Sequence, residues 1–95
     1  MIEITLKTGP MRAEGYEVDL GDWPFVFVVH HADRGGEPCE GRWIVSEAVS
    51  GFALTDDDYV SDDAAIRAAR AWLDAGKRWH RIHAIQRAIK LKMGK

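Results

Sequence analysis

Four histidines and a single cysteine are the residues of this sequence that could ligate a transition metal. His80 and His83 are three residues apart, a spacing that places both on one face of a helix. Adjacent residues of a strand point to opposite faces, so only one of His30 and His31 could join His80, His83 and Cys39 in a zinc site. Because the sequence contains no CxxC or HExxH motif, metal binding is a minor alternative and no cofactor is predicted.

Covalent catalysis has little support from the other reactive groups. Cys39 stands beside Glu40 and near Glu37, whose negative charges oppose formation of the thiolate that a cysteine nucleophile needs. The Gly35-Gly36 pair lacks the lysine and the following helix of a phosphate-binding loop. No pair of carboxylates stands out from the acidic background of the chain. We therefore predict that the protein is not an enzyme.

The segment TDDDYVSDD, residues 55–63, collects five aspartates. An EF-hand would need a central glycine and a distal glutamate, and this segment has neither. Such a cluster can imitate a phosphate backbone and occupy the basic groove of a nucleic-acid-binding protein. The alternative is a solvated loop that leads into a helix, whose N-terminal end favours negative charge. The candidate binding residues of this segment, which we call the acidic pole, are Asp56, Asp57, Asp58 and Asp62.

The last nineteen residues carry the opposite charge. Residues 77–95 contain seven of the thirteen basic residues and no acid, giving +7, whereas the rest of the chain, with six basic and fifteen acidic residues, carries −9. Lysine and arginine neutralise phosphates largely regardless of base sequence, and they also bind acidic protein surfaces. The alternative is a helix that is merely solvated or paired with the chain's own acids. The candidate binding residues of this basic segment are Lys77, Arg78, Arg81, His83, Arg87, Lys90 and Lys92.

Hydrophobic periodicity predicts the elements that position these charges. Alternating apolar residues predict strands near 2–7 and 16–20, and PFVFVVHH, residues 24–31, is typical of a central strand because both of its faces are apolar. Residues 32–41 are rich in glycine, proline and acids, which predicts a long loop. Residues 42–55 are predicted to form a β-hairpin that turns at Ser50 and Gly51.

Two helices are predicted after the acidic pole, over 62–75 and 77–92. Ser61 can cap the first, and Gly76 is a natural C-terminal stop, although one continuous bent helix is the alternative. The first helix would bury a stripe that contains Ile66, Ala69 and Leu73. The second would dock through one apolar face, with basic and histidine side chains on both flanks and small Ala84 and Ala88 within one of them. That face consists of Trp79, Ile82, Ile85, Ile89 and Met93.

Length and composition bound the fold. Ninety-five residues with 46% hydrophobic content predict one α+β domain over residues 1–95, with an antiparallel sheet of four or five strands in about 1–55. The sheet would pack against the first helix. A single cysteine excludes an internal disulfide, and we find no signal peptide or membrane-spanning segment, so we predict a cytoplasmic protein without a membrane partner. Among the four tryptophans, Trp23, in the turn before Pro24, is predicted to be the exposed one.

Two resemblances bear on function. The stretch GRWIVSEAVSGFALTDDDYVSDDAAIRAARAWL, residues 41–73, resembles the sheet-then-helix unit of arm-type DNA-binding domains of phage integrases, and also that of HicB-type antitoxins. In the integrase family the sheet reads DNA through basic and polar residues, whereas Arg42 is the single basic residue of this sheet region. In size, polarised charge and lack of a catalytic motif, the chain is similar to small phage and mobile-element proteins such as anti-CRISPR inhibitors. That similarity implies binding to a host nucleoprotein machine.

These observations predict a non-catalytic binding protein. The first hypothesis is a phage or mobile-element accessory or inhibitor protein that engages a host protein or nucleoprotein complex through its charged surfaces. The alternative is direct, largely sequence-independent binding of DNA or RNA through Arg81, Arg87, Lys90 and their neighbours. A metal protein or enzyme that uses His80, His83 and Cys39 is the minor alternative. A homodimer is expected if the core has no room for the apolar face of the second helix.

Overall fold

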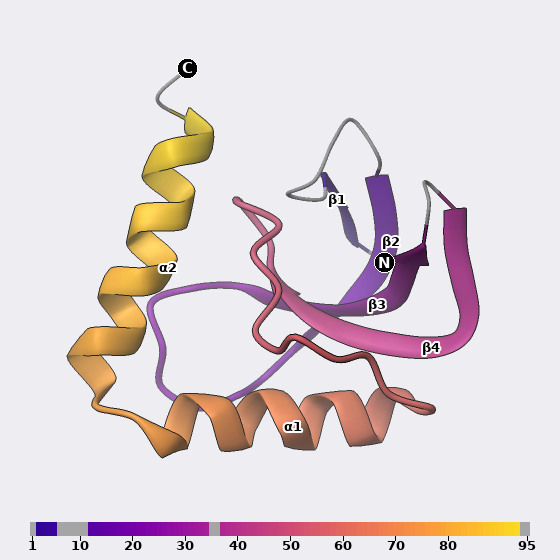
Figure 1. Cartoon of the computed structure of the whole chain (residues 1–95). Helices are drawn as coiled ribbons and strands as arrows, with labels where there is room; N and C mark the ends of the chain where they lie inside the picture. Colours follow the sequence, from indigo (N-terminus) through magenta and orange to yellow (C-terminus); the bar gives the residue numbers. More distant parts are fainter. Residues whose placement is uncertain (1, 6–11, 35–36, 94–95) are drawn as a thin grey trace.

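The fold is α+β, as predicted, with a curved antiparallel sheet and two helices (Figure 1). The structure is a computed structural model and describes residues 2–5, 12–34 and 37–93. The sheet has the order β1-β2-β3-β4, with β1 at Ile2–Thr5, β2 at Arg12–Val18, β3 at Phe27–Arg34 and β4 at Glu37–Glu47. As predicted, the segment that is apolar on both faces is a central strand, β3, which pairs with β2 on one side and β4 on the other.

The prediction of a long loop over residues 32–41 is wrong. The strands β3 and β4 continue to pair beyond the apolar segment, through a register shift between His31 and Ala32 and on to Arg34 opposite Glu37. Proline is tolerated there because Pro38 belongs to β4, the last strand in the sheet order. The β2 strand also begins earlier than predicted, at Arg12. The Gly35-Gly36 pair lies outside the described residues.

The predicted hairpin over 42–55 forms only in part. After β4 the chain turns through residues 48–50 and returns to a single bridge between Ser46 and Ala53, so residues 52–55 do not form a strand. The carboxylate of Glu47 holds this turn, because it accepts hydrogen bonds from the Val49 and Ser50 amides at 2.8 Å and from the Ser50 hydroxyl at 2.7 Å. This buried carboxylate therefore satisfies two backbone donors of the turn.

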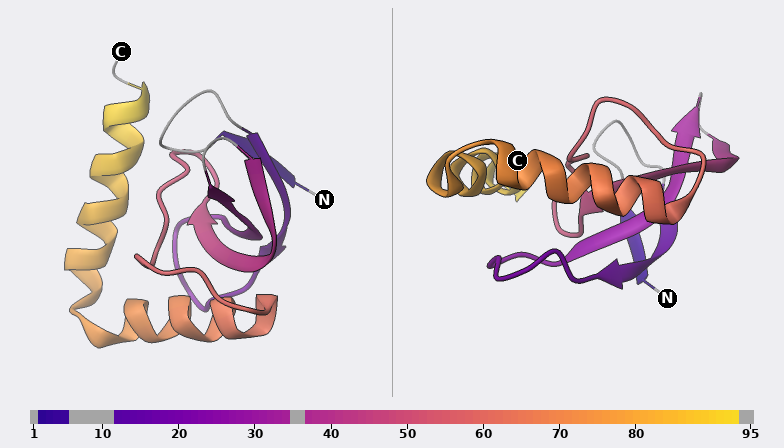
Figure 2. Two further views of the ribbon diagram at one scale, coloured as in Figure 1. Left: turned by 45° about the vertical axis from the view of Figure 1, so that its right-hand side comes forward. Right: turned by 90° about the horizontal axis from the view of Figure 1, so that it is seen from below.

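Both helices form close to the predicted positions, and the chain breaks between them. Helix α1 covers Asp62–Ala75 and α2 covers Arg78–Met93. As predicted, Ser61 caps α1, because its hydroxyl accepts from the Ala64 amide at 3.1 Å. Figures 1 and 2 show that α1 runs along the sheet and that α2 turns away sharply to stand beside it.

The main core lies between α1 and one face of the sheet. From the sheet, Phe27, Val29 and Val45 are buried, and the chain between β2 and β3 adds Leu20. Helix α1 buries Ala65, Ala69 and Leu73 against them, which confirms the predicted stripe except that Ile66 is only partly buried. Fully burying a side chain the size of Leu73 contributes about 1.5–3 kcal/mol. Leu54 and Ile85 complete the buried cluster.

Candidate interaction surface

Helix α2 is docked only through its middle. Ile85 is completely buried, and Ile82 and Ile89 are partly buried on either side of it. The prediction that Trp79 and Met93 join this docking face is wrong, because they are 57% and 72% exposed. The physical reason is the sharp turn after α1, which brings only the central turns of α2 against the core and leaves both ends beyond it (Figure 1).

Arg81 fastens α2 to the end of α1. Its Nε donates a hydrogen bond of 2.9 Å to the carbonyl oxygen of Trp72, and its guanidinium lies 4.1 Å from the centre of the Trp72 ring. The last carbonyls of a helix lack partners within the helix, and α1 has no basic residue in its own last turn. Arg81 supplies that missing donor and positive charge from the next helix. A Cβ atom on Gly76 would lie 2.7 Å from the Arg81 Cζ atom, so the glycine leaves room for this contact.

A second arginine joins α2 to the segment between β2 and β3. The guanidinium of Arg78 donates to the carbonyl oxygen of Asp22 and lies 4.5 Å from the centre of the Trp23 ring. Arg70 of α1 donates to the carbonyl oxygen of Asp19 at 2.9 Å. Trp23 is half-buried against the core under these contacts, so the prediction that it is the exposed tryptophan is wrong. Two of the predicted binding residues, Arg78 and Arg81, therefore have internal contacts.

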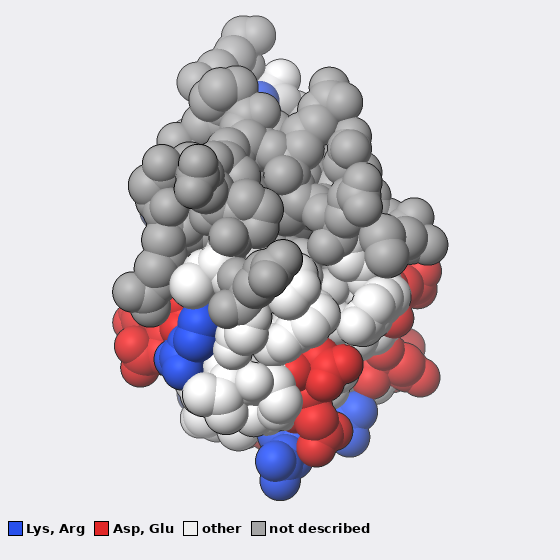
Figure 3. Space-filling model, turned by 90° about the vertical axis from the view of Figure 1, so that its right-hand side faces the viewer, with Lys and Arg blue, Asp and Glu red and all other residues white. Residues whose placement is uncertain are grey.

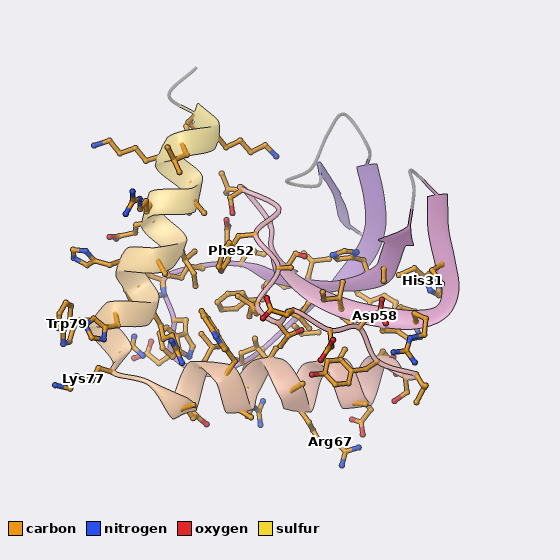
Figure 4. The ribbon with its side chains drawn as sticks, in the orientation of Figure 1. His31, Phe52, Asp58, Arg67, Lys77 and Trp79 are labelled. Atoms are coloured by element: carbon orange, nitrogen blue, oxygen red, sulfur yellow. The ribbon has the colours of Figure 1, made fainter. Side chains whose placement is uncertain are left out.

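Three further cations of the basic segment face solvent. Lys77, Arg87 and Lys90 are exposed, and their side chains make no hydrogen bond or ion pair with any residue that the structure describes. Lys92 is half-buried. Trp79 is exposed beside them, with the His80 ring 3.9 Å and the His83 ring 6.0 Å from it, centre to centre. Figure 4 shows Lys77 and Trp79 at the end of the molecule farthest from His31.

A groove runs along one flank of α2. It has a volume of about 500 Å³ and lies between α2 and the turn at residues 50–52. Its surface is mainly apolar, with cationic side chains at the edge. The lining residues are Ser50, Phe52, Ala84, Arg87, Ala88, Leu91 and Lys92. A shallower hollow of about 540 Å³ follows the opposite flank, where Gln86 and Ile89 meet the segment 23–26.

The acidic pole lies at the other end of α1. Asp58 is bound internally, since Arg42 Nε donates to its carboxylate at 2.7 Å and Arg42 also donates to its carbonyl oxygen. The carboxylate of Asp62 accepts from the Asp63 amide at the start of α1, while Asp56 and Asp57 are exposed. Figure 4 shows Asp58 far from Lys77, and Figure 3 shows acidic side chains around the lower part of the face opposite α2. The length of α1 therefore separates the acidic pole from Lys77 at the start of the basic segment.

Sequence reasoning missed a serine–histidine pair inside the sheet. The Nε2 atom of His30 on β3 and the hydroxyl of Ser46 on β4 are 2.8 Å apart, and His30 Nδ1 is 2.8 Å from the carbonyl oxygen of His31. Since a carbonyl oxygen only accepts, neutral His30 carries its proton on Nδ1 and Ser46 donates to Nε2. Burial lowers the pKa of His30, the hydrogen bond to the His31 carbonyl raises it, and the charge of His31 lowers it. Both residues are only 1% exposed, so this pair holds two strands together and is closed to a substrate.

The residues of the minor metal alternative do not meet. His80 and His83 lie on α2, and Cys39 lies on β4. The two adjacent histidines of β3 face opposite sides of the sheet, as predicted, because His31 stacks on Trp43 at 3.9 Å while His30 bonds to Ser46. Within the described part of the chain, no three histidine, cysteine, aspartate or glutamate side chains are grouped as a metal site would require.

Comparison with known proteins finds no relative. No family model matches the chain, and neither a curated protein nor a solved structure is significantly similar to it. Neither α1 nor α2 is long and apolar enough to cross a bilayer, and the same holds throughout residues 2–5, 12–34 and 37–93.

Proposed function

We propose that this chain is a non-catalytic binding protein that uses α2 to engage an acidic surface of a partner protein or of a protein–nucleic acid complex. One observation carries the proposal: the solvent face of α2 combines unpaired cations with large exposed apolar side chains. Lys77, Arg87 and Lys90 provide the charge, and Trp79 and Leu91, which is 66% exposed, provide apolar contact area. Tryptophan and arginine are the side chains most enriched among residues that dominate binding energy at protein interfaces.

A protein surface fits this helix better than bare nucleic acid does. Binding to a phosphate backbone depends on the number of cations that can reach it, and the guanidiniums of Arg78 and Arg81 are engaged internally. The apolar side chains of Leu91 and Met93 would gain nothing from phosphates, whereas a protein partner could bury them. The formal net charge of −2 and the exposed acids at the other end of α1 also oppose general binding to a polyanion.

The acidic pole has a supporting role in this proposal. Exposed Asp56 and Asp57 lie at the opposite end of α1 from the cations, so the molecule has a strong charge dipole. A dipole of this kind orients a protein as it approaches a partner that carries both signs of charge, and the effect weakens as salt screens it. The proposal thus retains Asp56 and Asp57 as secondary contacts. Asp58 acts through its bond to Arg42, which fixes the loop.

The biological role we propose is that of an accessory or inhibitor protein of a phage or mobile element. This role is supported by the resemblance to anti-CRISPR proteins in size and charge polarity. It is also supported by the surface of α2, which is suited to covering a site on another protein. An inhibitor of this kind acts by covering a site, and it needs no catalytic group of its own.

Direct nucleic-acid binding is the second candidate, and one observation favours it. Trp79 is exposed beside Lys77, and an aromatic ring next to a cation can stack a base of a single strand. This alternative predicts binding to a single-stranded oligonucleotide that falls steeply with salt and is lost in Trp79→Ala.

The test is co-purification from host extract, with and without nuclease, using wild type and a Lys77→Glu, Arg87→Glu, Lys90→Glu variant. Arg67→Glu is the control for a charge reversal away from α2, because Arg67 is an exposed cation on α1 (Figure 4). The proposal predicts at least one reproducible protein partner that is lost with the triple variant and retained by the control, and nuclease treatment shows whether that partner is a protein alone or part of a protein–nucleic acid complex. It is refuted if the triple variant captures the same proteins as wild type, or if nucleic acid is captured without any reproducible protein.

A further inference from the structure

The shape and charge of the groove beside α2 indicate which kind of partner segment it could bind. Its floor is apolar, built from Phe52 on the turn and from Ala84, Ala88 and Leu91 on the helix. Phe52 lies between α2 and the sheet (Figure 4). The three helical residues are spaced i, i+4 and i+7, so they form one continuous ridge about 10 Å long on the surface of α2. The two alanines keep that ridge low, which lets the backbone of another chain approach closely.

Such a shape accommodates a helix. Side chains at i, i+4 and i+7 of one helix pack into the grooves of a second helix that crosses it. Amphipathic helices bind comparable apolar grooves through side chains at i, i+3 or i+4, and i+7. The turn at residues 50–52 forms the opposite wall and is itself held rigidly by the buried Glu47 carboxylate. The site is therefore preformed on both sides.

Charge decides which helix could bind. Arg87 and Lys92 line the groove, and no acidic residue occurs anywhere in residues 77–95. The acid on the nearby turn, Glu47, is buried and bonded to Val49 and Ser50, so it does not offset the charge of Arg87 at the surface. A second copy of α2 packed against the groove would bring two helices of the same sign together, which is unfavourable.

We infer that this groove binds an amphipathic acidic helix of a partner protein, with apolar side chains along the groove floor and carboxylates facing Arg87. The inference rests on the proposed function and deepens it, since it specifies the part of α2 that makes the contact and the chemistry that it recognises. Lys77, Lys90 and Trp79 lie outside the groove itself and would contact other parts of the same partner.

The probe is a synthetic helical peptide with leucines at i, i+4 and i+7 flanked by glutamates, and its control is the same peptide with every glutamate changed to lysine. Binding is followed by fluorescence anisotropy and by backbone amide shifts in NMR spectra. We expect the acidic peptide to bind with a Kd below about 1 mM and the lysine peptide to bind at least about tenfold more weakly. The amide shifts should be concentrated at residues 50–52 and 84–92.

Two matched pairs of variants locate the site. Ala88→Glu places bulk and negative charge in the groove, whereas Ala71→Glu makes the same change at an exposed position of α1. We expect a loss of affinity of about tenfold or more for the first and less than about twofold for the second. Arg87→Glu and Arg67→Glu should differ in the same way. Circular dichroism and unfolding curves verify that each variant is folded.

The outcomes separate this inference from the proposed function. If the acidic peptide binds and Arg87→Glu weakens it, but Ala88→Glu does not, α2 binds acidic proteins outside the groove and only the inference is overturned. If neither peptide binds but a single-stranded oligonucleotide does, both the inference about the groove and the proposed function are overturned. Equal binding of the two peptides, or concentration-dependent self-association that displaces the acidic peptide, also overturns the inference.

Discussion

The buried His30 predicts a specific dependence of stability on pH. Its pKa in the folded protein lies below the ordinary value of 6.5, primarily because burial penalises the charged ring. Both ring nitrogens are also engaged as a neutral imidazole would be, with Nδ1 donating to the His31 carbonyl and Nε2 accepting from Ser46. A second proton on Nε2 would break the bond from the Ser46 hydroxyl.

The direction in which stability changes with pH follows from proton linkage. Between the folded pKa of His30 and 6.5, the unfolded chain binds more protons at this histidine than the folded chain does. Stability therefore rises with pH across that window: the contribution is fully present above 6.5 and is lost as pH falls toward the folded pKa. One proton gives a slope that approaches about 1.4 kcal/mol per pH unit where the two states differ completely.

The assay is urea unfolding, followed by tryptophan fluorescence at a series of pH values from about 7.5 down to about 5.5, above the range where exposed carboxylates titrate. The variant His30→Asn retains an amide donor for the His31 carbonyl but does not titrate. The control is His83→Asn, at an exposed position of α2. We expect the slope of unfolding free energy against pH to be smaller in His30→Asn than in wild type, and to fall by less in the control. Equal slopes for wild type and His30→Asn would refute the reasoning.

Three further predictions concern the contacts that fix α2 and the adjoining turn. Ile85→Ala should lower the free energy of unfolding by about 2–5 kcal/mol, because the side chain is completely buried, and a loss below about 1 kcal/mol would show that α2 is not docked there. Arg81→Met should lower the free energy of unfolding by about 1 kcal/mol, because the hydrogen bond to the Trp72 carbonyl and the charge over the Trp72 ring are lost. Hydrogen exchange of the α2 amides should also increase. Unchanged exchange would show that Arg81 does not hold α2 against α1. Glu47→Ala should lower the free energy of unfolding by about 1–3 kcal/mol, because it leaves the buried Ser50 amide unpaired. Glu47→Gln should recover part of this loss. Equal stability of wild type and both variants in urea would contradict this prediction.

The sequence alone determined the elements whose formation depends on nearby residues. Helix α1 begins after Ser61 because that hydroxyl satisfies an amide three residues later, and the chain breaks at Gly76 as its composition predicts. The central position of β3 followed from its two apolar faces, which need cover on both sides. The separation of charge into an acidic and a basic segment is also a property of composition along the chain.

Tertiary structure decided which apolar residues of α2 are buried and which of its arginines make internal contacts. The face of α2 contains five large apolar residues, but only Ile85 is completely buried, because the angle at which α2 leaves α1 determines which turns reach the core. Arg78 and Arg81 are indistinguishable in sequence from Arg87, yet they bond to carbonyls of Asp22 and Trp72 that are near only in space. Neither the pairing of His30 with Ser46, sixteen residues away, nor the groove between α2 and the turn at 50–52 could be read from periodicity. Periodicity reports which face of an element is apolar, whereas the contacts of that face depend on long-range packing between elements.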